Sequence, residues 1–341
     1  MGSLQSERQA SIHKLLSTTT RSRPLLTHIN NDTSWLLSLP IPKSYQASRQ
    51  DSRIYFHILI DPWLTPSNSI APWFLQQYHV DVPACTTISA VEELINTIEA
   101  ASGKFTDGSR GEIIDAIVTN HTNTDHTNKE TLLQVDPSVP VYSRFDSAKM
   151  IKSWKHFDQV YTIPSFGKEG ALDWRTSSEG NLPEWLSFWH LGWKEGFPAL
   201  HFGLMITWEN SGHKDGEGEC LVLSPHGIFV DDIKIIGDAK PAIRPLAILH
   251  TMKETWSWPF GTANLGAIHG LKVMREAKPK YWIPTHDELV TSTGGYSWFL
   301  REREITVEEA LKQEESEKKE ERQTKGFEFA VVGNGESFVL A

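Results

Sequence analysis

The spacing of apolar residues predicts strands that alternate with helices from residue 53 onwards. A strand at "RIYFHILIDPWL" is expected to end at Asp61. The next segment predicts a helix, with Ser89 and Glu92 as a capping box and Gly103 as the stop. Four apolar residues fall on one face of this helix, as expected for a helix that packs against a core: Val91, Leu94, Ile95 and Ile98.

The alternation continues through residues 112–163. The patterns predict strands at "EIIDAIV", "VPVYS" and "QVYTI", and helices near "NKETLL" and "SAKMIKSW". Strands that alternate with helices are typical of an α/β sheet with covered faces. In such sheets, functional loops follow the carboxyl ends of the strands.

Longer strand patterns follow in the second half, at "FPALHFGLMITW", "ECLVLS", "PLAILH" and "KYWIPTH", with one helix over "NLGAIHGLKVMREA". The first of these strands contains His201. The other three end at or just before His226, His250 and His286. Residues 301–325 predict a charge-dense, solvated helix, and "FEFAVVGNGESFVLA" predicts a closing hairpin turned at Gly333 to Gly335.

Composition limits the classes of protein that the chain can represent. Residues 1–50 are rich in Ser, Thr, Arg and Gln, which predicts a partly ordered lead-in before a single domain over residues 51–341. The 33 Lys and Arg against 43 Asp and Glu, without a basic stripe, argue against nucleic acid as a partner. No apolar stretch is long enough for a membrane span, so no membrane partner is expected. The sequence predicts no oligomeric state.

The two cysteines, Cys85 and Cys220, exclude a disulfide framework and a cysteine-rich zinc site. This usage, with no signal-peptide core, predicts a cytoplasmic protein. The sequence also contains no G-x-S-x-G elbow, no P-loop and no G-x-G-x-x-G after a strand. Catalysis by a metal ion instead needs ligands that converge from separate loops and leave one position open for water. The residues that offer this are His121, Asp125, His126, His201, His226 and His286.

Five short motifs in order resemble those of the metallo-β-lactamase-fold superfamily. "HTNTDH" resembles its H-x-H-x-D-H signature in the degenerate form H-x-N-x-D-H, and "ILIDPWL" resembles its first motif. "FPALH", "LVLSPHG" and "IPTHDE" resemble the third, fourth and fifth motifs. The nearest branch is the lactonase-like one. The resemblance implies a four-layer αβ/βα sandwich and a metal-dependent hydrolase, with Asp61 orienting the ligand loop.

Two departures from the family pattern change the expected metal site. Asn123 replaces a histidine of the first site, and an amide oxygen is a weaker ligand than imidazole. His226 stands where the family has a bridging aspartate, with Asp238 as the alternative residue for that position. The resemblance therefore implies one metal ion, held by Asp125, His126 and His286 with His226 as a fourth ligand, and His250 in support. Zinc is the expected metal, with manganese or iron as alternatives.

The predicted reaction is attack of metal-bound water on the carbonyl of a small ester, thioester, lactone or amide, with Asp125 also as general base. Tryptophans near the motifs favour an apolar or aromatic small-molecule substrate: Trp63, Trp73, Trp256, Trp258 and Trp282. Two other functions remain open. One is a non-hydrolytic metalloenzyme of specialised metabolism, such as a dehydratase, isomerase or cyclase. The other is a metal-free binding protein, in which these histidines and aspartates have structural roles.

Overall fold

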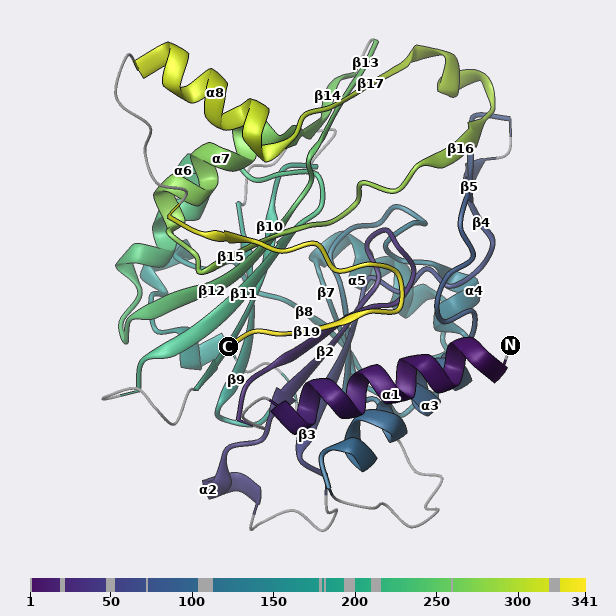
Figure 1. Ribbon diagram of the computed structural model, residues 1–341, viewed down its shortest axis with the longest axis vertical. Coiled ribbons are helices and arrows are strands. Elements are labelled where there is room, and N and C mark those ends of the chain that lie inside the picture. The colour runs from purple at the N-terminus through teal and green to yellow at the C-terminus, as the bar shows by residue number, and fades with distance from the viewer. Residues whose placement is uncertain are drawn as a thin grey trace. The chain divides into compact units, whose positions relative to one another are not determined.

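The computed structural model describes residues 2–18, 22–46, 53–71, 73–103, 113–177, 180, 182–192, 200–209, 216–258, 260–318 and 326–341. The chain forms two compact units (Figure 1). Unit 1 comprises Met1–Ile70, Tyr78–Thr162 and Val332–Ala341, and unit 2 comprises Ala71–Gln77 and Ile163–Val331. The chain leaves unit 1 along β4 (Ser67–Ala71) and returns along β5 (Leu75–His79).

Unit 1 contains a seven-stranded sheet in the order β19-β1-β2-β3-β6-β7-β8. Its strands are β1 (Leu25–His28), β2 (Trp35–Pro40), β3 (Tyr55–Ile60), β6 (Ala116–Thr119), β7 (Val141–Ser143), β8 (Val160–Thr162) and β19 (Ser337–Val339). The strands from β19 to β3 are antiparallel, whereas β3, β6, β7 and β8 run parallel. The loops after β3 and β6 therefore begin at the same edge of the sheet.

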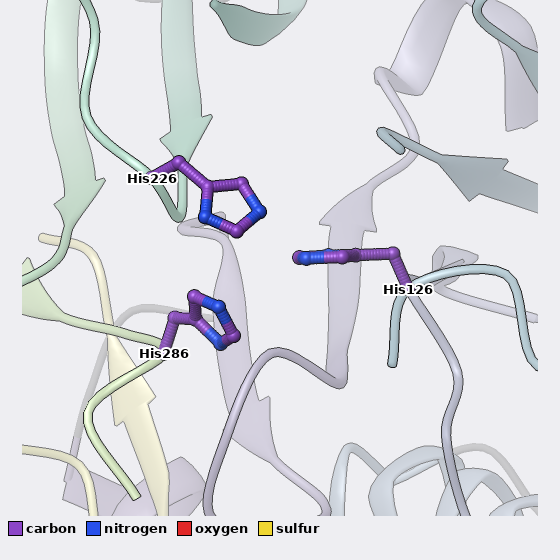
Figure 2. Close-up of side chains that lie close together, drawn as sticks. All are labelled: His126, His226 and His286. Carbon is purple, nitrogen blue, oxygen red and sulfur yellow. The ribbon is translucent and has the colours of Figure 1, made fainter. Parts of the chain in front are cut away.

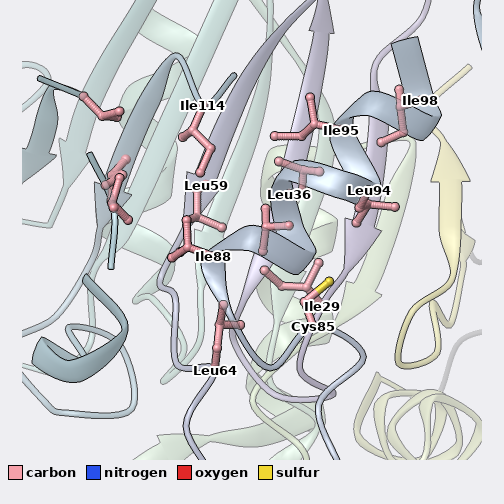
Figure 3. Close-up of a cluster of buried hydrophobic side chains, with 14 of the residues drawn as sticks. Ile29, Leu36, Leu59, Leu64, Cys85, Ile88, Leu94, Ile95, Ile98 and Ile114 are labelled. Carbon is pink, nitrogen blue, oxygen red and sulfur yellow. The ribbon is translucent and has the colours of Figure 1, made fainter. Parts of the chain in front are cut away.

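The larger helices of unit 1 pack on the sheet through one apolar core (Figure 3). They are α1 (Gly2–Thr18), α3 (Ile88–Ala101) and α5 (Phe145–Ser153), and the unit also contains the short helices α2 (Lys43–Gln46) and α4 (Lys129–Leu132). The core joins Ile12 and Leu16 of α1 to Ile95 of α3 and to Leu59 of β3. Burial of each such side chain stabilises the fold by about 1.5–3 kcal/mol.

Helix α3 follows the predicted amphipathic pattern, and its four predicted face residues are all buried. The predicted capping box was wrong by two positions. The N-cap is Thr87, whose hydroxyl accepts from the N–H of Ala90 at 3.2 Å, so Ser89 lies inside the helix. Gly103, with φ of 85°, lies just beyond the helix end, as predicted.

The first 40 residues supply part of unit 1, where the sequence had predicted a partly ordered lead-in. Helix α1 and strands β1 and β2 belong to this segment, and Leu25, Leu26 and Trp35 are fully buried. The polar composition concealed these strands because each is short and its apolar residues fall between runs of Ser, Thr and Asn.

Unit 2 contains a six-stranded sheet in the order β18-β15-β12-β11-β10-β9. Its strands are β9 (Leu186–Leu191), β10 (Gly203–Glu209), β11 (Gly218–Ser224), β12 (Ile243–His250), β15 (Tyr281–Pro284) and β18 (Glu328–Phe329). Strands β11, β12, β15 and β18 run parallel. Ser224, His250 and Pro284 lie in register, so the ends of three strands are level.

Four helical segments pack on this sheet through a second apolar core. They are α6 (Val230–Ile233), η3 (Lys234–Asp238), α7 (Gly266–Ala277) and α8 (Val307–Lys318). A smaller sheet has the order β14-β13-β17, formed by β13 (Lys253–Ser257), β14 (Gly261–Leu265) and β17 (Leu300–Glu304). The remaining elements are β16 (Val290–Thr293), η1 (Lys168–Gly170), η2 (Trp174–Ser177) and η4 (Gly295–Phe299).

Three predictions for the second half were wrong in detail. His201 precedes β10 and is not inside a strand, and residues 197–199 of that pattern lie outside the described residues. Residues 300–304 form β17, so the helix begins only at Val307; residues 319–325 lie outside the described residues. The closing hairpin does not form, because β18 joins β15 of unit 2 whereas β19 joins β1 of unit 1.

Candidate metal centre

The ligand loop of unit 1 follows β6 and is held by the loop after β3. Because β3 and β6 are parallel neighbours, with Ile60 paired to Val118, Asp61 begins its loop beside the ligand loop. Its Oδ1 accepts from the backbone N–H of Asn120 at 2.6 Å, and its Oδ2 lies 2.9 Å from Nδ1 of His126. Histidines that bind metals commonly donate their other ring N–H to a carboxylate in this way.

Asp61 is fully buried, and this burial raises the pKa of its carboxyl group, while the adjacent His126 acts in the opposite direction. Its backbone has a φ of 43°, which is uncommon for a residue other than glycine. The unusual conformation and the two side-chain hydrogen bonds together fix the ring of His126. With Nδ1 engaged, Nε2 is the atom that this ring presents as a metal ligand.

A tight turn forms the centre of the ligand loop. The carbonyl of Asn123 accepts from the N–H groups of His126 and Thr127 at 3.0 and 2.8 Å, so Asn123 serves as a turn residue. Its own N–H donates to Nδ1 of His121 at 3.1 Å. Asp125 follows in the turn, and its Oδ2 lies 3.6 Å from Nε2 of His126. The loop thus places one carboxylate beside one oriented imidazole.

His226 and His286 come together at the level strand ends of unit 2. His226 follows β11 and His286 follows β15, and their ring centres are 4.8 Å apart with the planes nearly perpendicular (Figure 2). Nδ1 of His226 lies 2.7 Å from Oδ1 of Asn264 on β14, which orients the ring so that Nε2 faces away from Asn264. His286 has a φ of 62°, a second uncommon backbone conformation at a candidate ligand.

His201 and Asp238 are the remaining ligand candidates of unit 2. Both ring nitrogens of His201 lie near backbone carbonyls, Nδ1 at 3.2 Å from His226 and Nε2 at 3.1 Å from Thr262. Asp238 is exposed at the end of η3, whereas His226 is buried. The structure therefore favours His226 over Asp238 for the fourth position, and gives His201 a structural contact.

His250 is a buried support for the strand ends. Its Nδ1 lies 2.8 Å from the carbonyl of Thr251, and burial lowers the pKa of its ring to about 4. A Cβ atom at Gly270 of α7 would lie 2.9 Å from this nitrogen, so a larger residue there would displace the ring. Asp287, which follows His286, accepts from the N–H groups of Met252 and Lys253 at 2.9 Å. These hydrogen bonds connect the turn after β15 to the turn after β12.

Sequence reasoning missed two residues at these sites. Asn264 lies on a strand of the smaller sheet, and no motif marks it as a partner of His226. Asp32 lies in the loop between β1 and β2, within the segment predicted as a lead-in, and it is 3% exposed. Its carboxylate and that of Asp125 have oxygens within 4.8 Å of each other. Only the three-dimensional pairing of β1 and β2 with β3 reveals this proximity.

The tryptophans divide between core and surface. Trp63 and Trp282 are fully buried. Trp73, Trp256 and Trp258 are between 47 and 78% exposed, so the tryptophans near the motifs do not all have the same role.

Among the described helices, none is long and apolar enough to cross a membrane.

The donor atoms present in each unit fit a metal ion. Imidazole nitrogens and carboxylate oxygens suit zinc, manganese and iron, and in each unit one imidazole is held by a side-chain oxygen on Nδ1. The donor chemistry of each unit therefore fits a metal ion.

Comparisons with known proteins identify the fold. No protein-family model and no curated protein sequence match the chain. An isothiocyanate hydrolase from Delia radicum gut bacteria has a similar structure, at 17% identity and a TM-score of 0.52, over 92% of this chain and 98% of that protein. A possible metal-dependent hydrolase from Veillonella parvula matches at 15% identity and a TM-score of 0.53, over 93% and 99%.

These similarities show that the chain shares the fold of the two hydrolases, which agrees with the metallo-β-lactamase fold that the order of the motifs predicts. The mixed α/β class predicted from the sequence is confirmed, since each unit is a sheet with helices on one face. At this level of identity the likeness shows the fold alone, and the lactonase-like branch stays a prediction.

Proposed function

We propose that the chain is a metal-dependent hydrolase that binds a single metal ion through residues of its sequence motifs. The ligands in this proposal are those that the motifs predict: Asp125, His126, His226 and His286. The observation that carries it is the orientation of two imidazoles, His126 by Asp61 and His226 by Asn264. The two similar structures reported above are described as an isothiocyanate hydrolase and a possible metal-dependent hydrolase, which supports the reaction class.

The bound metal would lower the pKa of a water molecule and polarise the substrate carbonyl. Within the chain, Asp61 fixes the direction of the His126 ring, and Asn264 does the same for His226. Asp125 is the general base of the proposal, because its carboxylate lies beside His126 and is only 7% exposed. Zinc is the proposed metal, since histidine-rich sets with a carboxylate are typical of it.

The proposed substrate is a small apolar or aromatic ester, thioester, lactone or amide. Support comes from exposed aromatic residues at the smaller sheet of unit 2, which also carries Asn264: Trp256 on β13 and Trp258 directly after it are 47 and 61% exposed. Because one similar structure is an isothiocyanate hydrolase, benzyl isothiocyanate belongs in the test panel beside phenyl acetate and an aryl lactone. We further propose that the protein acts in the cytoplasm, where its two free, buried cysteines remain reduced.

The deciding experiment is metal analysis of the purified protein and of variants. We expect one equivalent in the wild type, and strong loss in His126→Ala and in His226→Ala, because each removes a proposed imidazole ligand. His156→Ala is the matched control, since its ring contacts only a backbone carbonyl, that of Val135, among the hydrogen bonds described. Two equivalents, or none after gentle purification, would contradict the proposal.

Turnover tests the reaction class separately. Asp125→Asn should abolish turnover of the panel substrates while the protein remains folded by circular dichroism. Hydrolysis carried out in labelled water must place the labelled oxygen in the product, whereas isomerisation or dehydration would leave the product unlabelled.

A further inference from the structure

The loop between β1 and β2, residues 29–34, is almost wholly buried and is held by hydrogen bonds within it. Oδ1 of Asn30 accepts from the N–H groups of Asp32 and Ser34, each at 2.9 Å, and its Nδ2 donates to the carbonyl of Trp63. Asn31 adopts a φ of 68°. These contacts hold the loop in one conformation, and Asp32 lies at its centre.

The same loop is fastened to the residues of the metal centre. Ser34 donates to the carbonyl of Asp61 at 2.7 Å, and Thr33 donates to the carbonyl of Asp125 at 3.0 Å. Asp32 directly precedes these two residues, one of which contacts the ligand loop and the other Asp61. Its backbone is positioned by the hydrogen bond to Asn30 and by the two contacts that follow it in the loop.

Asp32 and Asp125 place two carboxylates close together with little access to water. Their oxygens lie within 4.8 Å, and the side chains are 3 and 7% exposed. Two negative charges at this distance repel each other, and the repulsion grows as water is removed. A divalent cation between them reverses the sign of the interaction. His126, oriented by Asp61 and 3.6 Å from Asp125, adds a neutral nitrogen donor to the two carboxylates.

We propose that Asp32 is a carboxylate ligand of the metal ion, beside Asp125. The assignment rests on the proposed metal-dependent function and adds a ligand that lies outside all five sequence motifs. It also explains how the chain tolerates His226 at the position of the family's carboxylate. Two aspartates restore a charge of −2 to the ligand set, which balances a divalent cation.

The proposal is tested by measuring the Kd for Zn²⁺ and Mn²⁺ by chelator competition, with Co²⁺ absorption spectra as a second measurement. Asp32→Asn keeps the shape of the side chain and removes its charge. We expect its Kd to rise by at least about 10-fold, and the Co²⁺ spectrum to change. Asp32→Glu retains a carboxylate, so its Kd should lie nearer to that of the wild type.

Two controls separate a ligand from a structural residue. Thr33→Val removes the hydroxyl that contacts Asp125 but keeps Asp32, and Asp81→Asn removes an exposed charge of unit 1.

In chelator-treated protein, Asp32→Asn should have a Tm equal to or above that of the wild type, because one of two repelling charges is gone. A lower Tm for the chelated variant, with unchanged Kd, would instead identify Asp32 as structural and overturn the proposal.

The outcomes also distinguish this proposal from the proposed function. A wild type that binds none of the three metals contradicts the metal-dependent function itself. A wild type that binds metal, with Asp32→Asn equal to it in Kd and in Co²⁺ spectrum, contradicts only the assignment of Asp32.

Discussion

Replacement of Asn264 by alanine tests the metal centre directly. Asn264 lies outside the sequence motifs, and its side chain contacts the ring of His226. Its Oδ1 lies 2.7 Å from Nδ1 of His226, and its side chain is 6% exposed. Without this acceptor, the His226 ring can rotate and its tautomer is no longer fixed. Loss of such a partner typically weakens metal binding by about 10- to 100-fold, which is about 1.4–2.7 kcal/mol.

A second substitution at the same position should preserve or strengthen metal binding instead of weakening it. In Asn264→Asp, a carboxylate replaces the amide, and hydrogen bonds to charged acceptors are roughly twice as strong as neutral ones. We therefore expect Asn264→Asp to bind metal at least as tightly as the wild type, in the manner of the Asp61–His126 pair. Thr262→Ala is the control, since it lies on the same strand with an exposed side chain.

Chelator competition with Zn²⁺ measures all three variants, and circular dichroism confirms that each is folded. The reasoning is refuted if Asn264→Ala is folded and keeps the wild-type Kd. It is also refuted if alanine and aspartate at this position weaken binding equally, because the amide oxygen would then have no orienting role.

Three further predictions concern other contacts. Asp61→Ala should weaken metal binding by about 10- to 100-fold, measured by the same competition, because it removes the carboxylate on Nδ1 of His126; an unchanged Kd would contradict the role of Asp61. Burial alone would raise the pKa of Glu99, but hydrogen bonds from His57 and from the N–H groups of Ile54 and Tyr55 outweigh it, so this pKa lies below the usual 4.5. Glu99 therefore stabilises the fold above pH 4.5, and this contribution disappears as pH falls through the folded-state pKa. Urea unfolding between pH 7 and 3 should show Glu99→Gln less stable at pH 7 and the gap to the wild type closing in acid; a constant gap would count against the reasoning. Ile95→Ala should lower the free energy of unfolding by about 2–5 kcal/mol, since the side chain is fully buried in the core of unit 1, and its metal Kd should equal that of the wild type.

The parts of the fold that were predictable are those encoded by local periodicity. The apolar face of α3 and the strands that end near Asp61, His250 and His286 all follow from residues close in sequence. The failures occurred where pairing between distant segments decides the structure. Strand β19 exists because Ser337–Val339 pairs with Leu25–Thr27, and no local pattern contains that information.

The candidate site shows the same division. Asp61, Asp125 and His126 were found because a motif places them at the ends of two strands that turn out to be parallel neighbours. Asn264 and Asp32 were missed because Asn264 reaches His226 from another sheet and Asp32 reaches Asp125 from another loop. Asp238 matched a short pattern, but it is exposed, whereas His226 is buried and packs against His286.

The pairing of β19 with β1 has a consequence for the order in which the protein folds during synthesis. Unit 1 contains both β1 and β19, and all of unit 2 lies between them in sequence. The ribosome must therefore finish unit 2 before the sheet that carries the ligand loop can be completed. We expect a released chain that ends at residue 331 to protect unit 2 from protease better than it protects β1.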